Sequence, residues 1–120
     1  ADVDIRFIPL TEDEQKQAIA AGPYNFAGSI PADSYDFIQE DVPTLCMIQE
    51  LIVDNDMDED TVYEMTKTLV EHWDDLVSVV SGAGRVNPLV DINNCIVPIH
   101  PGAIKYYEEQ GITIKPELKP

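Results

Sequence analysis

The chain has 120 residues, of which 23 are acidic and 7 are basic, so its formal net charge is −16. Its composition, 44% hydrophobic and 25% charged, is that of a folded domain and not of a disordered chain. Seven basic side chains cannot build the positive surface that binding to nucleic acids or anionic membranes requires. Prolines also interrupt the uncharged stretches, and none supplies the roughly 18 continuous apolar residues of a membrane span. We therefore expect no nucleic-acid partner and no direct insertion into a membrane.

The first third of the chain predicts one strand, one short helix and a long loop. Apolar and polar residues alternate over 3–9, which predicts a strand that a proline ends. Thr11 and Glu14 have the spacing of a capping box and predict a helix that reaches about residue 21. A Gly-Pro pair follows, and residues 23–43 are expected to form a loop because glycine and proline recur in them.

The rest of the chain predicts a buried strand followed by two helices. Residues 44–53 are the most apolar run and predict a buried strand. Residues 59–80 carry apolar side chains at spacings of three and four, which predict one long helix that begins at the N-cap Asp58. Residues 87–97 are expected to connect this helix to the next one, with a short strand near their end. A last helix is predicted over 101–110 because proline suits its first turn and glycine follows it.

No metal site is visible in the spacing of the cysteines and histidines. Cys46 and Cys95 are too far apart for paired zinc ligands, and they could either form one disulfide or stay as two buried thiols. His72 and His100 lack a second ligand at helical spacing, and we expect His100 to accept a backbone hydrogen bond at the start of the last helix. The acidic run at 54–60 fails the calcium-loop pattern because the glycine and the closing glutamate are missing.

No catalytic motif is visible either. No serine, cysteine or lysine lies in a nucleophile motif, and no glycine-rich phosphate loop follows a predicted strand. We therefore expect no enzymatic activity and no cofactor.

Four of the aromatic residues lie in the segment that is otherwise predicted to be a loop: Tyr24, Phe26, Tyr35 and Phe37. Aromatic rings in an irregular segment can line a ligand cleft, where a ring supplies contact area and a hydroxyl supplies orientation. They can equally cover a core beneath a long loop. The spacing of these residues leaves both interpretations open.

Three segments resemble the TAXI-type solute receptors, the extracytoplasmic binding subunits of TRAP transporters. The most specific is VPIHPGAIKYYEEQG at 97–111, which is similar to the closing segment of that family. The second is SIPADSY at 29–35, followed by EDVPT at 40–44, and the third is DTVYEMTK at 60–67. Their order and spacing agree with the family over about residues 3–112.

The resemblance implies an α/β fold that is the C-terminal part of a two-lobed, type II periplasmic-binding-protein-like architecture. Residues 1–112 would supply the end of the second lobe, a hinge strand at about 44–53 and the C-terminal helices. The N-terminal lobe of such receptors is expected to be missing from this piece. Residues 113–120, with three charges and two prolines, are expected to be a mobile tail.

The resemblance also implies a function, which is the capture of a small organic anion outside the cytoplasm. The expected solute is a glutamate-like amino acid or a dicarboxylate, and the expected partners are the TRAP membrane permease subunits. Periplasmic or other extracytoplasmic localisation follows from the same resemblance. We expect Tyr35 to contact the solute, with Tyr24 and Ser34 as weaker candidates.

Two departures from the family pattern concern the loop around Tyr35. The glycine and proline of the family are replaced here by Asp33 and Asp36, which add negative charge and bear on the ligand preference. Residues 33–75 hold fourteen acidic residues and one basic residue, which fits a solvated face, a salt-adapted protein or a docking face for a basic surface. The alternative function is an acidic, non-catalytic interaction module that reuses the fold without a ligand.

Overall fold

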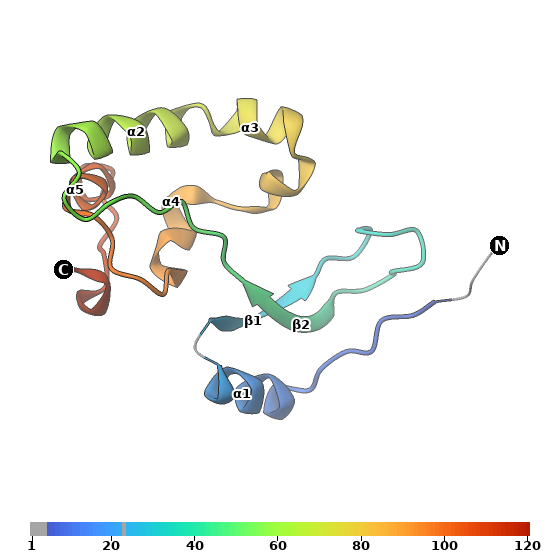
Figure 1. Ribbon diagram of the computed structural model, residues 1–120. Helices are drawn as coiled ribbons and strands as arrows, with labels where there is room; N and C mark the ends of the chain where they lie inside the picture. The colour runs from blue at the N-terminus through green and yellow to red at the C-terminus, as the bar shows by residue number, and fades with distance from the viewer. Residues whose placement is uncertain (1–4, 23) are drawn as a thin grey trace. The chain divides into compact units, whose positions relative to one another are not determined.

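The computed structural model describes residues 5–22 and 24–120 of the chain. The chain divides into two compact units, Ala1–Gln49 and Glu50–Pro120 (Figure 1). Within the described ranges, no helix is both long enough and apolar enough to cross a membrane.

The first unit contains one helix, α1 (Glu12–Ala21), and the predicted capping box begins it. The Thr11 hydroxyl accepts a hydrogen bond from the Glu14 backbone N–H at 3.3 Å. The Glu14 carboxylate in turn accepts from the Thr11 backbone N–H at 2.8 Å. Both bonds satisfy donors that a helix start would otherwise leave unpaired, so the sequence located this helix correctly.

A two-stranded antiparallel hairpin packs beside α1 and consists of β1 (Asn25–Ile30) and β2 (Val42–Met47) (Figure 1). The helix is tied to both strands by one buried side chain. The Gln15 amide donates to the Gly28 carbonyl at 3.2 Å and to the Thr44 carbonyl at 2.7 Å. This arrangement fixes the hairpin, and the hairpin fixes the long loop that joins its strands.

Three expectations for the first unit were wrong. Residues 25–30 form a strand and not a loop, because pairing with β2 outweighs the weak strand propensity of a glycine-containing segment. Residues 5–9 form no strand: among the described residues, none of them bonds to the β2 backbone, and the Leu10 N–H that follows them donates to the Pro43 carbonyl. Residues 3 and 4 of that prediction lie outside the described residues. The strand expected at 44–53 is only the half-buried β2, and residues 48–53 have no regular structure.

The second unit is helical within its described residues. Its elements are α2 (Glu59–Glu71), α3 (Trp73–Val79), η1 (Ser81–Arg85), α4 (Pro88–Asp91), η2 (Ile92–Asn94), α5 (Pro101–Glu109) and η3 (Pro116–Leu118). The predicted caps are confirmed at two of them. Asp58 accepts from the Thr61 N–H at the start of α2, and the His100 ring nitrogen accepts from the Gly102 N–H at the start of α5. The short strand expected near residue 96 does not form; this part of the chain bends without regular structure.

The long helix predicted over 59–80 is divided at His72. The backbone there leaves helical geometry, with φ −107° and ψ 24°, and a second helix begins at Trp73. The Trp73 indole N–H donates to the Ala83 carbonyl at 3.1 Å, which fixes α3 against η1. The helical spacing of apolar residues continues across the break, so periodicity alone predicts one helix and does not show that it is divided at His72.

The core of the second unit lies between α5 and the C-terminal segment. Its buried members are Ile99, Tyr106, Tyr107, Ile114 and Leu118. Figure 1 shows α5 next to α2 and the C-terminal segment next to α5. The tail expected at 113–120 therefore belongs to the core, because two of its few apolar side chains are almost fully buried. The Ile99 N–H also donates to the Leu118 carbonyl at 2.7 Å.

Candidate functional site

The loop that joins β1 to β2 is closed by its own hydrogen bonds. The Ala32 N–H donates to the Asp41 carboxylate at 2.8 Å, across the base of the loop. The Asp33 N–H donates to the Ile38 carbonyl, and the Ile38 N–H donates to the Tyr35 carbonyl. Ile38 itself is buried. A loop held in this way presents its side chains on a fixed backbone.

Asp33 adopts a backbone conformation that few side chains tolerate. Its φ is +65°, in the left-handed region that glycine favours and that aspartate visits more readily than most residues. In the TAXI-type segment that this loop resembles, the corresponding residue is a glycine. Asp33 adopts a backbone conformation that glycine would adopt without strain, and it adds a negative charge there.

Three exposed aromatic rings lie together beside this loop, and we call them the aromatic cluster: Phe7, Tyr35 and Phe37. Their ring centroids are 5.6–5.8 Å apart in all three pairs. Such separations are typical of favourable aromatic contacts. All three rings keep more than a third of their surface exposed, so they could contact a ligand. The interpretation that loop aromatics cover a core does not fit Tyr35 and Phe37, because about half of each side chain is exposed.

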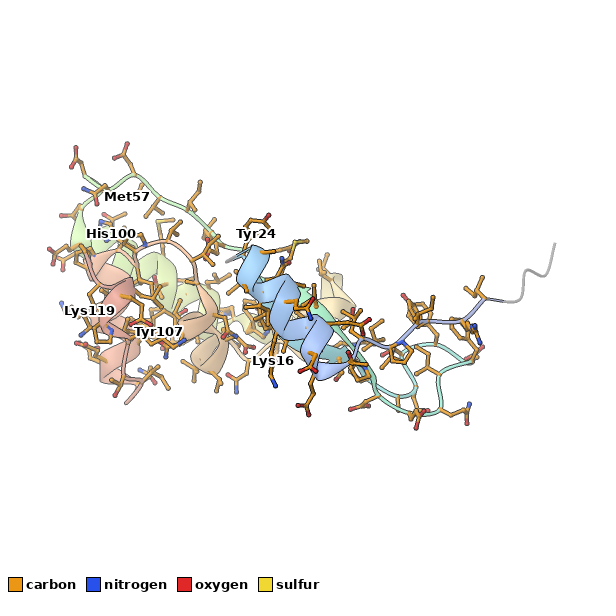
Figure 2. All side chains as sticks on the ribbon, turned by 90° about the horizontal axis from the view of Figure 1, so that it is seen from below. Lys16, Tyr24, Met57, His100, Tyr107 and Lys119 are labelled. Atoms are coloured by element: carbon orange, nitrogen blue, oxygen red, sulfur yellow. The ribbon has the colours of Figure 1, made fainter. Side chains whose placement is uncertain are left out.

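The structure separates the three predicted ligand-binding residues. Tyr35 belongs to the aromatic cluster, and Ser34 precedes it. The Ser34 hydroxyl donates to the Pro31 carbonyl at 2.6 Å. Ser34 could therefore accept a hydrogen bond from a ligand, but its own proton is already used within the turn. Tyr24 lies beyond the C-terminal end of α1 (Figure 2), at the opposite end of the hairpin from the loop. Six-residue strands place roughly 17–20 Å between the hairpin ends, so Tyr24 and Tyr35 cannot share one small ligand site.

Phe7 is the member of the cluster that the sequence did not indicate. Its position in an alternating segment favoured a strand, and a strand residue would pack on a sheet. No local signal could have placed it beside Tyr35, because the contact spans the helix α1 and the strand β1.

A model of the NMT1-like family matches residues 1–111. The chain belongs to the NMT1-like family. Members of this family are periplasmic solute-binding proteins, so a solute-binding role and a small-molecule ligand hold for the chain at this coarse level. The family also supports a periplasmic-binding-protein-like fold, with which the mixture of helices and sheet agrees.

The electrostatics of the NMT1-like chain around the aromatic cluster are negative. The loop at 31–41 contains four carboxylate side chains and no lysine or arginine: Asp33, Asp36, Glu40 and Asp41. Arg6 precedes Phe7 in the chain and is exposed. A solute carboxylate would therefore be repelled by this loop, whereas an apolar or aromatic portion of a solute would find contact area there.

The two cysteines of the NMT1-like chain are separate thiols and do not form a disulfide with each other. Both are free and partly buried. Burial, followed by the neighbouring Glu50 carboxylate, raises the pKa of Cys95 to about 11, so its thiolate is scarce at neutral pH. Among residues 5–22 and 24–120, no three histidine, cysteine or acidic side chains converge as metal ligands would.

Proposed function

We propose that this chain captures a small organic solute in the periplasm as part of a TAXI-type receptor of a TRAP transporter. The observation that carries the proposal is the aromatic cluster, in which two exposed rings of a closed loop, Tyr35 and Phe37, contact a third ring, Phe7, in a chain from a solute-binding family. Tyr35 would contact the solute directly. Phe7 and Phe37 would hold the Tyr35 ring in place and extend its surface.

The proposed solute is an organic anion, a glutamate-like amino acid or a dicarboxylate, as the resemblance implies. Because the loop is acidic, we expect different groups to bind the carbon skeleton and the carboxylates of the solute. The aromatic cluster would contact the carbon skeleton of the solute, and the Tyr35 hydroxyl could donate a hydrogen bond to it. The carboxylates of the solute would be held by groups outside the loop, because the loop that carries Tyr35 and Phe37 contains four negative side chains.

Binding would act through closure of two lobes around the solute. A solute that contacts the closed form better than the open form shifts the equilibrium toward closure, and the permease would recognise that form. Residues 44–53, which follow the loop, would act as the hinge in this mechanism. No chemical step is required of the protein, so the proposed role is transport and not catalysis.

A solute panel tests the proposal through ligand-dependent stability. A ligand that binds only the folded state stabilises it by about 2.7 kcal/mol at a hundredfold excess over its Kd. We expect the unfolding temperature to rise with glutamate or with a dicarboxylate such as succinate. We expect Tyr35→Ala to remove that rise and Tyr24→Ala, an equally exposed tyrosine at the far end of the hairpin, to preserve it. Equal responses of the two variants would overturn the role of the cluster.

A further inference from the structure

A shallow groove, wide open to solvent, runs along one face of α2 in the second unit. Its volume is about 770 Å³. Its lining comes from α2 and from the segment that precedes it: Leu51, Asp60, Thr61, Glu64, Met65, Thr68 and Leu69. None of these residues belongs to the loop or to the aromatic cluster.

The floor of the groove is apolar and exposed. Leu51 is 72% exposed, and Met65 and Leu69 are 40% and 37% exposed, although all three are large apolar side chains. Met65 and Leu69 are four residues apart on α2, so they lie on one face of the helix, one turn from each other. Thr61 and Thr68 lie on the same face at spacings of four and three from Met65, which is the pattern of a helix that receives another helix.

The rim of the groove is negative. Asp60 and Glu64 line it, and the surrounding residues 54–75 contain nine carboxylates and one lysine. The Asp60 carboxylate lies 3.9 Å from the Lys105 ammonium, and both side chains are largely exposed, so this pair neutralises little. Within the described part of the chain, Glu64 has no ion-pair partner.

We propose that this groove docks a basic amphipathic helix of a partner protein. Leucine, methionine or phenylalanine side chains of that helix would cover Leu51, Met65 and Leu69. Lysine or arginine side chains on its flanks would pair with Asp60 and Glu64, as charges beside a helix-helix seam do. The acidic field would also speed the encounter with a basic partner.

The charge excludes the other occupants of such a groove. A second copy of the chain would bring the same acidic face, and two rims of like charge would repel each other. An anionic membrane surface would be repelled for the same reason. The inference is independent of solute capture, because the groove and the aromatic cluster belong to different units.

A pair of synthetic peptides tests the docking. Each has about 18 residues, enough for a helix, with leucine on one face. One peptide carries lysine on its flanks and the other carries glutamate at the same positions. In fluorescence anisotropy, we expect the lysine peptide to bind the full chain and the glutamate peptide not to bind. The affinity should fall as salt is added, because salt screens exposed charges.

Three double variants locate the peptide. We expect Asp60→Lys with Glu64→Lys to weaken the lysine peptide about tenfold or more. The control is Glu71→Lys with Asp74→Lys, which changes the net charge equally outside the groove and should weaken binding by less than about threefold. Met65→Ser with Leu69→Asn should also weaken it about tenfold, because the apolar floor is lost. Circular dichroism checks that each variant keeps its helices.

Several results would overturn the inference. Absence of binding by the lysine peptide would overturn it. Equal weakening by the two charge variants would also overturn it, because that result would indicate attraction to the whole acidic surface instead of the groove. Insensitivity to the Met65 and Leu69 changes would show that the floor is not used. A dimer in sedimentation experiments that dissociates with those two changes would show that a second copy covers the groove.

Discussion

Asp33 connects the sequence of the loop to its geometry. With a φ of +65°, it occupies a position where glycine would be unstrained, and its side chain makes the loop more negative. We predict that Asp33→Gly stabilises the loop by up to ~1 kcal/mol, because relief of backbone strain exceeds the entropy that glycine adds to the unfolded chain. Amide hydrogen exchange in β1 and β2 should slow by up to about fivefold.

Asp36→Gly is the matched control for that change. Asp36 is an aspartate of the same loop, but its φ is not positive. Glycine there removes a charge without relieving strain and should speed exchange slightly. Equal effects of the two substitutions would show that charge, and not backbone geometry, sets the stability of the loop.

Tyr63 and Glu109 join α2 to α5 through a hydrogen bond of 2.6 Å from the phenol to the carboxylate. This bond, followed by burial, raises the pKa of Tyr63 to about 12 from its ordinary value of 10. We predict that Glu109→Gln lowers the pKa of Tyr63 toward 10, as measured by carbon NMR of the tyrosine rings. Glu108→Gln, the preceding residue, pairs with Lys119 and should leave this pKa unchanged.

The same pKa makes the contribution of Tyr63 to stability depend on pH. Because the pKa is higher in the folded chain than in the unfolded chain, the contribution is complete below pH 10 and is lost as the pH rises through about 12. Glu109→Gln should flatten this decline. If the stability of the variant fell as steeply with pH as that of the unchanged chain, the loss would have to come from other tyrosines.

At the scale of elements, the crossing of α2 and α5 depends on one glycine. A Cβ atom added to Gly102 would overlap sterically with the Glu59 carbonyl oxygen and lie too close to the Tyr63 backbone nitrogen. Both are backbone atoms, so no side-chain rotation could relieve the clash. We predict that Gly102→Ala lowers the free energy of unfolding of the second unit by about 1–3 kcal/mol. Urea unfolding followed by the fluorescence of Trp73, the chain's single tryptophan, measures this unit.

Gly82→Ala supplies the comparison for that experiment. A Cβ atom at Gly82 meets nothing within 4 Å, and its φ needs no glycine. This substitution should be neutral, or stabilising by up to about 1 kcal/mol. A loss of stability in Gly82→Ala as large as that in Gly102→Ala would rule out close packing as the cause.

Elements with local signals could be predicted from the sequence. The capping box of Thr11 and Glu14 located α1, and His100 with its following proline located α5, because a cap is formed by neighbouring residues. Strand β1 could not be predicted, since it depends on a partner more than ten residues away. The burial of the C-terminal segment could not be predicted, because its prolines and charged residues are typical of a mobile tail. In the structure, the buried side chains of Ile114 and Leu118 hold this segment against the core.

The candidate site follows the same rule. Tyr35 and Phe37 were visible as aromatic residues in an irregular segment, and the structure brings them together. The sequence did not indicate the contact of Phe7 with Tyr35 or the separation of Tyr24 from Tyr35, because it does not show which end of a hairpin a residue occupies. Local chemistry therefore indicated the loop, and only the fold completed the cluster.

At the scale of the whole molecule, the net charge of −16 is the dominant feature. The three lysine–carboxylate ion pairs of the described residues are exposed and contribute little, so repulsion among carboxylates opposes folding. We predict that the unfolding temperature rises between about 10 mM and 100 mM sodium chloride, as the Debye length falls from about 30 Å to 10 Å. Calorimetry measures this. A falling temperature would mean that the exposed pairs outweigh the repulsion.

The central claim, that the aromatic cluster of this NMT1-like chain contacts a solute, is tested most directly by NMR. Backbone and ring resonances of the full chain are followed while glutamate or succinate is added. We expect the shifts to concentrate on Phe7, Tyr35 and Phe37 and to saturate with a single Kd. Saturable shifts centred on Tyr24 or on the second unit, with the cluster unaffected, would contradict it.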